Sequence, residues 1–173
     1  MSAIKQQHVL IGSIELPGSE ITAYHAATRT AFVIGGNDEL YLVSLLDPAN
    51  PLLTAKIRLA GNAQSVAVNA DGLVAVAVDQ EATILGSTAT YHADGLVQFF
   101  TISGTTVIPA GQVTVGSLPD SIAFNEDGTV LVTANEGEPN MFYTSADDSM
   151  DPLGSISIIE VNAATPASSG VTT

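Results

Sequence analysis

The sequence ANEGEP, late in the chain, gathers oxygen-bearing side chains of the kind that bind hard cations. Glu136 and Glu138 flank a glycine, Asn135 precedes them, and Asp120 stands upstream in the same repeat. Calcium prefers carboxylate and amide oxygens, and a glycine can adopt the positive φ that turns both glutamates toward one centre. We therefore take Asp120, Asn135, Glu136 and Glu138 as candidate metal ligands for Ca²⁺. The alternative is an acidic surface turn in which Asn135 and Glu136 only cap strand ends.

Two long polar segments, DQEATILGSTATYHADG and NEGEPNMFYTSADDSMDPLG, extend this set of candidates. Each is longer than an ordinary hairpin connection, and long loops on a rigid β frame often carry function. The second contributes three more carboxylates and an apolar patch that could clamp the loop or a ligand. These residues are Asp147, Asp148 and Asp151, and Met141, Phe142 and Tyr143.

Catalytic groups are sparse. Of the histidines His8, His25 and His92, only His92 lies in one of the long segments, where it could serve as a base. No serine stands in a nucleophile-elbow context, and no glycine-rich phosphate loop opens a helix. The absence of cysteine excludes thiol chemistry and disulfides. The sequence thus identifies no catalytic residue and leaves enzymatic activity undecided.

The charge balance excludes some partners. The formal net charge is −14 because Lys and Arg number only 4 against 18 Asp and Glu. Such a surface repels nucleic acid and anionic membranes and attracts cations, although adaptation to a salty or calcium-rich medium would give the same balance. The longest apolar run, Leu73 to Val78, is far shorter than the ~20 residues of a membrane span. The N-terminal stretch lacks the continuous apolar region of a signal peptide, so either the protein is intracellular or its leader is not part of this chain.

Three segments of the chain repeat one pattern: EITAYHAATRTAFVIGG, QSVAVNADGLVAVAVDQ and DSIAFNEDGTVLVTANE. Each has an apolar strand, a polar turn and a second apolar strand, and each is followed by further strand-forming sequence. The turns NADG and NEDG carry the Asp-Gly pair typical of tight hairpins. The repeat spacing is that of β-propeller blades, about four strands each. We therefore expect an all-β fold of about three four-stranded antiparallel blades in an incomplete ring.

The expected divisions of the chain follow these repeats. They are an N-terminal segment 1–11, blade-like repeats 12–59, 60–115 and 116–162, and a C-terminal connection or tail 163–173. In a propeller, the connection that enters each inner strand and the loop that leaves the second strand lie on one face of the ring. We expect that face to collect the entering residues Glu20, Gln64 and Asp120 and the loop residues Asn37, Asp38, Asp79, Glu81, Asn135, Glu136 and Glu138.

The stretches GNAQSVAVNADGLVAVAV and GSLPDSIAFNEDGTVLVTANEGEP, followed by DPLGSISIIEV, resemble the bacterial choice-of-anchor I domain. The resemblance runs from about Gly12 to Val161, and it covers only the N-terminal portion of members that are usually much longer. Members are extracellular or surface-attached propeller proteins, and some relatives are labelled alkaline phosphatase-like. The resemblance therefore implies an extracellular or cell-surface location more firmly than it implies a reaction.

The leading hypothesis is a portion of a surface β-propeller that serves binding or display, with calcium as a candidate stabilising ion. Its ligand is unknown, and remaining blades or self-association are expected to cover the open sheet faces. The alternative is a metal-dependent phosphoesterase in which Asp120, Glu136 and Glu138 hold the metal.

The repeats also predict a core. We expect the inner-strand residues Val66, Val68, Ile122 and Phe124 to point inward, with Val74, Val76, Val130 and Val132 packing beside them.

Overall fold

The structure is a computed structural model that describes residues 8–35, 37–83, 90–103, 106–138, 152–162 and 164–173. It contains three four-stranded antiparallel sheets, each made of consecutive strands. The first sheet comprises β1 (Ser19–His25), β2 (Thr30–Gly35), β3 (Glu39–Ser44) and β4 (Leu52–Arg58). The second comprises β5 (Asn62–Val68), β6 (Leu73–Thr83), β7 (Thr90–Ser103) and β8 (Thr106–Ser117). The third comprises β9 (Pro119–Phe124), β10 (Val130–Asn135), β11 (Ser155–Glu160) and β12 (Gly170–Thr172).

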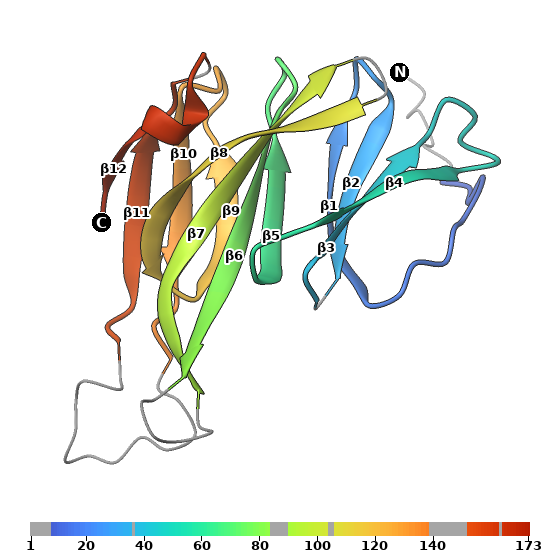
Figure 1. The fold of residues 1–173 in the computed structure, drawn as a ribbon. Helices are drawn as coiled ribbons and strands as arrows, with labels where there is room; N and C mark the ends of the chain where they lie inside the picture. The colour runs from blue at the N-terminus through green and yellow to red at the C-terminus, as the bar shows by residue number, and fades with distance from the viewer. Residues whose placement is uncertain (1–7, 36, 84–89, 104–105, 139–151, 163) are drawn as a thin grey trace, which may run out of the picture.

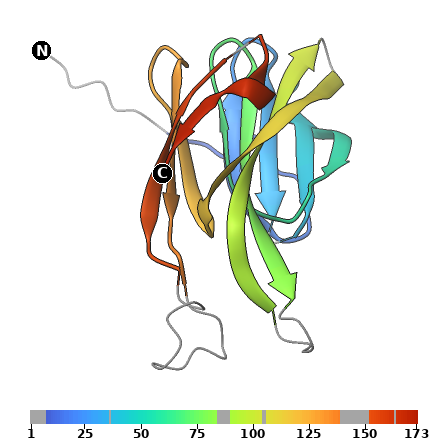
Figure 2. The ribbon, with the colours of Figure 1, turned by 60° about the vertical axis from the view of Figure 1, so that its left-hand side comes forward.

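The sheets stand side by side as successive blades, with β5 in contact with both β1 and β9 (Figures 1 and 2). Each blade therefore begins with its inner strand and runs outward, as the repeats predict. This arrangement confirms the all-β fold of propeller blades in an incomplete ring. No helix in the described part of the chain is long and apolar enough to cross a membrane.

The last strand begins later than the repeats suggest. Residues 163–173 were expected to form a connection or tail, but β12 lies within them and pairs with β11, placing Val171 opposite Ile159. A short 3-10 helix, Pro166–Ser168, precedes β12. The C-terminal segment therefore supplies the outer strand of the third sheet.

The predicted Asp-Gly hairpins form in both repeats. Gly72 and Gly128 have φ of 84° and 73°, a region that disfavours other residues. Ahead of each glycine an asparagine side chain closes the turn: Asn69 Oδ1 accepts from the Leu73 N–H at 2.9 Å, and Asn125 Oδ1 accepts from the Val130 N–H at 2.9 Å. These local bonds fix where each second strand starts.

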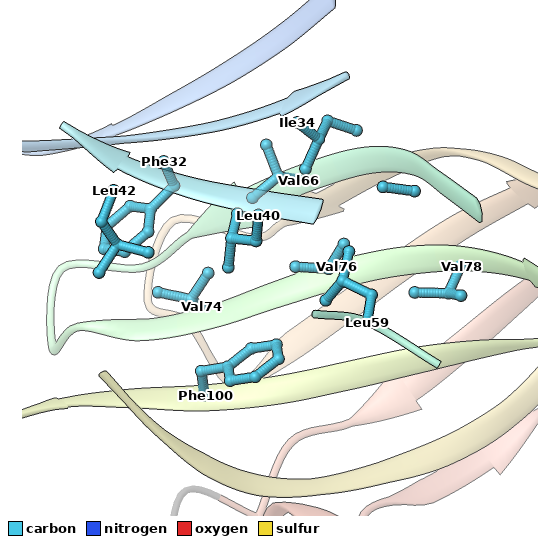
Figure 3. Close-up of a cluster of buried hydrophobic side chains, with 11 residues drawn as sticks. Phe32, Ile34, Leu40, Leu42, Leu59, Val66, Val74, Val76, Val78 and Phe100 are labelled. Carbon is cyan, nitrogen blue, oxygen red and sulfur yellow. The ribbon is translucent and has the colours of Figure 1, made fainter. Parts of the chain in front are cut away.

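Apolar side chains fill the space between the first and second sheets (Figure 3). β2 and β3 present alternate residues toward β6, as expected for strands with one face on a core. The cluster contains Phe32, Ile34, Leu40, Leu42, Leu59, Ala63, Val66, Val74, Val76, Val78 and Phe100, all buried.

A second cluster joins the second sheet to the third. The intervening residues of β6, Leu73, Ala75 and Ala77, point to this side, so β6 is buried on both faces. Their partners include Leu131 and Ile159, each 0% exposed. The predicted inward positions of Val66, Val74, Val76 and Ile122 are confirmed, while Val68 and Phe124 are half-buried.

The prediction for Val132 is wrong: it is 37% exposed and faces away from the second sheet, whereas its neighbour Leu131 is fully buried. The reason is the length of the turn. The backbone hydrogen bond that closes the second hairpin joins Asn69 to Leu73, four residues on, but that of the third joins Asn125 to Val130, five residues on. One added turn residue exchanges the two faces of the following strand. Val130 is on the same face of β10 as Val132, and it is half-buried.

The outer face of the third sheet is consequently apolar and uncovered. Val132 and Ile158 are paired across β10 and β11, and Ile156 stands two residues along. Their exposed fractions are 37%, 44% and 57%. This face, defined by Val132, Ile156 and Ile158, has the character of a blade surface that packs against another layer.

Replacing Leu131 by alanine should lower the free energy of unfolding by about 2–5 kcal/mol, because truncation leaves a cavity between two packed sheets. Val132→Ala is the matched control from the opposite face and should cost less than about 1 kcal/mol. Chemical denaturation of both variants measures the difference. Equal losses would show that the strand phase described above is incorrect.

Candidate functional site

The loop face predicted from the repeats is present at one end of the three sheets. In each blade the start of the inner strand pairs with the end of the second strand: Ser19 with Gly35, Asn62 with Asp79, and Pro119 with Asn135. The connections at these six strand ends therefore emerge on the same side, which is the lower end of the sheets in Figure 1. We call this side the loop face.

Three of the four candidate metal ligands lie exposed on the loop face. Asp120 is the second residue of β9, and Glu136 and Glu138 follow the end of β10. The Glu136 N–H donates to the Leu118 carbonyl at 2.9 Å, which ties this loop to the connection between β8 and β9. Gly137 has a φ of 63°, the left-handed bend that the glycine was expected to supply.

The fourth candidate, Asn135, has a side chain 3% exposed that is committed to other partners. Its Nδ2 donates to Ser155 Oγ at 3.1 Å and Ser157 Oγ at 3.0 Å, and its Oδ1 accepts from Thr133 Oγ1 at 2.9 Å. Those bonds use both amide hydrogens and occupy the carbonyl oxygen. Asn135 therefore joins β10 to β11 through a buried polar network.

A glycine of the second sheet makes room for this network. A Cβ at Gly116 would lie 2.6 Å from both Asn135 Nδ2 and Ser155 Oγ, closer than atoms can approach. The Gly116 N–H also donates to Ser157 Oγ at 3.2 Å. The network thus holds the loop-face ends of the second and third sheets together.

Two carboxylates at the start of β3 are paired with cations of β4. Asp38 forms an ion pair with Arg58, and Glu39 Oε2 lies 3.4 Å from Lys56 Nζ. A hydrogen bond from the Tyr41 hydroxyl, together with the charges of Lys56 and Arg58, lowers the pKa of Glu39. Asn37 accepts the Glu39 N–H at 3.0 Å, which caps the start of β3.

No three histidine, aspartate or glutamate side chains among the described residues come close enough to hold a metal ion. Asp147, Asp148 and Asp151, with Met141, Phe142 and Tyr143, lie outside the described residues. A calcium site that combines Glu136 and Glu138 with other oxygens therefore stays a prediction.

The segment DQEATILGSTATYHADG was expected to be a long loop, and most of it is a β ribbon. β6 continues to Thr83 and β7 begins at Thr90, with Gln80 opposite Ala93 and Glu81 opposite His92. Residues 84–89 lie outside the described residues. The sequence did not predict these strands because they extend beyond the apolar core. They therefore lack the alternating apolar residues by which a half-buried strand is recognised.

The ribbon holds a histidine–carboxylate pair. His92 Nδ1 lies 3.0 and 2.9 Å from the two carboxylate oxygens of Asp79, whose side chain is only 2% exposed. The sequence predicts a loop position for Asp79 and a possible base in His92. Their pairing was not foreseen, although both stood in the same polar segment.

His92 lines a cleft of about 650 Å³ beside the ribbon. The other lining residues come from β6, β7, the end of β8 and the stretch before β11, and they are Gln80, Glu81, Ala82, Tyr91, Ala93, Asp94, Leu96, Thr114, Ser117 and Pro152. The volume falls within the ~300–1,000 Å³ typical of small-molecule sites. The cleft is the candidate functional site of the loop face.

Comparison with known proteins places the chain in a family and supports its fold. The family model described as "Choice-of-anchor I domain" matches residues 20–173. Among curated proteins, none matches the sequence.

Solved structures of similar fold are distant in sequence. A putative 6-phosphogluconolactonase from Bacteroides fragilis superimposes with a TM-score of 0.62 at 13% identity, over 90% of this chain and 37% of that one. Sqt1 from Saccharomyces cerevisiae does so with a TM-score of 0.56 at 11% identity, over 89% of this chain and 34% of that one. The chain thus spans about a third of their length, and at these identities the likeness concerns the fold alone.

Asn135→Ala should lower the free energy of unfolding by about 1–3 kcal/mol, because it leaves the buried Thr133 hydroxyl without its acceptor and removes two hydrogen bonds to β11. Asn50→Ala, in an exposed turn, is the control and should change stability by about 0.5 kcal/mol or less. Thermal or chemical unfolding without added metal compares the two. Equal effects would contradict a structural role for Asn135.

Proposed function

The chain belongs to the choice-of-anchor I domain family, and on this premise we propose that it is part of an extracellular or cell-surface β-propeller that binds a ligand on its loop face. The observation that carries the binding role is the cleft lined by His92, which lies where strand ends of two sheets meet. Long strand extensions on a rigid β frame are common sites of recognition. The family supports the location.

Further blades complete the proposed ring. The apolar face formed by Val132, Ile156 and Ile158 has the composition of the buried faces between the sheets described here. A following blade would cover it in the same way that the third sheet covers Leu73, Ala75 and Ala77 of β6. Burial of apolar surface contributes about 25 cal/mol per Å², so such a face favours association with another sheet over exposure. Self-association of the chain is the alternative covering.

The metal-dependent phosphoesterase hypothesis gains nothing from the described residues. Its three proposed ligands, Asp120, Glu136 and Glu138, form no metal-binding group of three there. The cleft also lacks the cationic side chains that would neutralise a phosphoryl substrate. A binding role is therefore the function that the geometry supports best.

Surface display is tested on cells that produce the full-length protein. An antibody raised against residues 20–173 should label intact cells as strongly as permeabilised cells, because the loop face must be accessible to an outside ligand. An abundant cytoplasmic protein serves as the control for cell integrity. Labelling that requires permeabilisation would defeat the proposed location.

Cation stabilisation rests on the acidic loop and has its own test. If Glu136 and Glu138 help to bind calcium, millimolar calcium should raise the melting temperature relative to excess chelator, because an ion that binds only the folded state stabilises it. The Glu136→Gln and Glu138→Gln variants should lose most of this increase, while Glu15→Gln, far along the chain, should keep it. If the unfolding curves of the unmodified protein with calcium and with chelator superimpose, the loop binds no calcium and is an acidic surface turn.

A further inference from the structure

Asp79 of β6 continues a row of buried apolar residues. Leu73, Ala75 and Ala77 alternate along one face of β6, and Asp79 stands two residues further on. A register shift between Val78 and Gln80 marks the change from packed strand to free ribbon. Burial of a carboxylate costs several kcal/mol unless it is paired. The position is therefore chemically costly and requires the partner that His92 provides.

The pairing fixes the tautomer of the imidazole. An ionised carboxylate only accepts hydrogen bonds, so the ring nitrogen that faces Asp79, Nδ1, must carry a proton. In the neutral ring the lone pair then belongs to Nε2. Nε2 makes no hydrogen bond to any described residue, and the side chain of His92 is 26% exposed on the wall of the cleft. The arrangement presents an oriented hydrogen-bond acceptor to whatever enters.

The rest of the cleft selects by charge. Glu81 and Asp94 are exposed carboxylates on its wall, and its lining includes neither lysine nor arginine. The chain has only four such residues, and Arg29, Lys56 and Arg58 all belong to the first sheet or its turns. An anionic ligand would meet like charge with no compensating cation. A neutral ligand rich in hydroxyl groups would instead find several acceptors.

The acceptors of the cleft lie on one face of the ribbon. Glu81 is opposite His92 across β6 and β7, and Asp94 is two residues beyond His92 on β7. Successive residues of a strand point to opposite faces, so His92, Glu81 and Asp94 share a face and the neighbouring Tyr91 points the other way. A neutral sugar, with its rim of hydroxyl donors, suits such a group of acceptors.

We propose that this cleft binds a neutral carbohydrate through its hydroxyl groups, one of which donates to Nε2 of His92. Asp79 is the positioning residue, because it holds the imidazole in the accepting tautomer and touches no ligand atom. Glu81 and Asp94 accept further hydroxyl hydrogens. This inference rests on the binding role proposed above for the loop face and specifies the class of ligand.

The test uses the full-length protein labelled with ¹⁵N at histidine, at about pH 8 where a free imidazole is neutral. The probes are cellotriose, maltotriose and triacetylchitotriose up to about 10 mM, with trigalacturonate as the acidic counterpart. The His92 ring signal, assigned by its loss in His92→Gln, should report the Nδ1-protonated tautomer. At least one neutral trisaccharide should shift this signal. The affinity for trigalacturonate should be lower by a factor of about ten or more.

Two variants separate positioning from folding. Asp79→Asn places an amide where Nδ1 was bound, so the ring can change to the Nε2-protonated tautomer and affinity should fall about tenfold or more. If that variant does not fold, Glu81→Ala, opposite His92 on the exposed ribbon, should weaken binding by a similar factor. Asp71→Asn, in the exposed turn between β5 and β6, should change neither readout.

The result that overturns the proposal is specific. Absence of any shift of His92 with the three neutral trisaccharides, an Nε2-protonated ring in the unmodified protein, or full affinity in Glu81→Ala would each do so. These outcomes are independent of the surface-labelling experiment. A protein that labels on intact cells and ignores neutral sugars would retain its proposed location and lose the proposed ligand.

Discussion

The second sheet is packed on both faces, and the other parts of the molecule are arranged around this constraint. Along β6, Val74, Val76 and Val78 face the first sheet while Leu73 and the two alanines that alternate with them face the third. A strand that is apolar on both sides must be covered on both sides. The first interface uses large side chains, and the second combines small residues of β6 with larger ones from β10 and β11. Stacking of sheets, rather than any local preference, therefore determines the architecture.

The character of the sheet contacts changes toward the loop face. The apolar stripe of β6 ends in Asp79, and that of β10 passes from Leu131 through Thr133 to Asn135, all buried. At this end the second sheet is hydrogen-bonded to the third sheet and its loop: the Gly116 N–H donates to Ser157 Oγ, and the Gly137 N–H donates to the Ser117 carbonyl. Buried polar groups whose partners are all satisfied rigidify their surroundings. The candidate cleft is thus bordered by a fixed polar layer, which can hold side chains such as His92 in one orientation.

The sequence predicted the blades and the hairpin turns because strand alternation and the Asp-Gly pair are local signals. It missed the phase of β10, since NADG and NEDG look alike and only the hydrogen bond from Asn125 to Val130 reveals the added residue. It identified His92 as a possible base but assigned Asp79 to a loop. Their pairing depends on how β6 aligns with β7, which single-strand patterns do not encode. Asn135 was assigned to a metal for its chemistry, whereas its neighbours in three dimensions give it a structural task.

The few basic residues of the chain are distributed unevenly over the three sheets. Lys56 and Arg58 pair with Glu39 and Asp38, so these two loop-face carboxylates are compensated. Among the described residues, the second and third sheets contain no lysine or arginine. Screening by salt extends over about 8 Å under physiological conditions, so a ligand inside the cleft experiences the carboxylates on its walls directly. The selectivity that we propose against anions therefore depends on the absence of basic residues from the cleft wall, and it requires no unusual number of acidic ones.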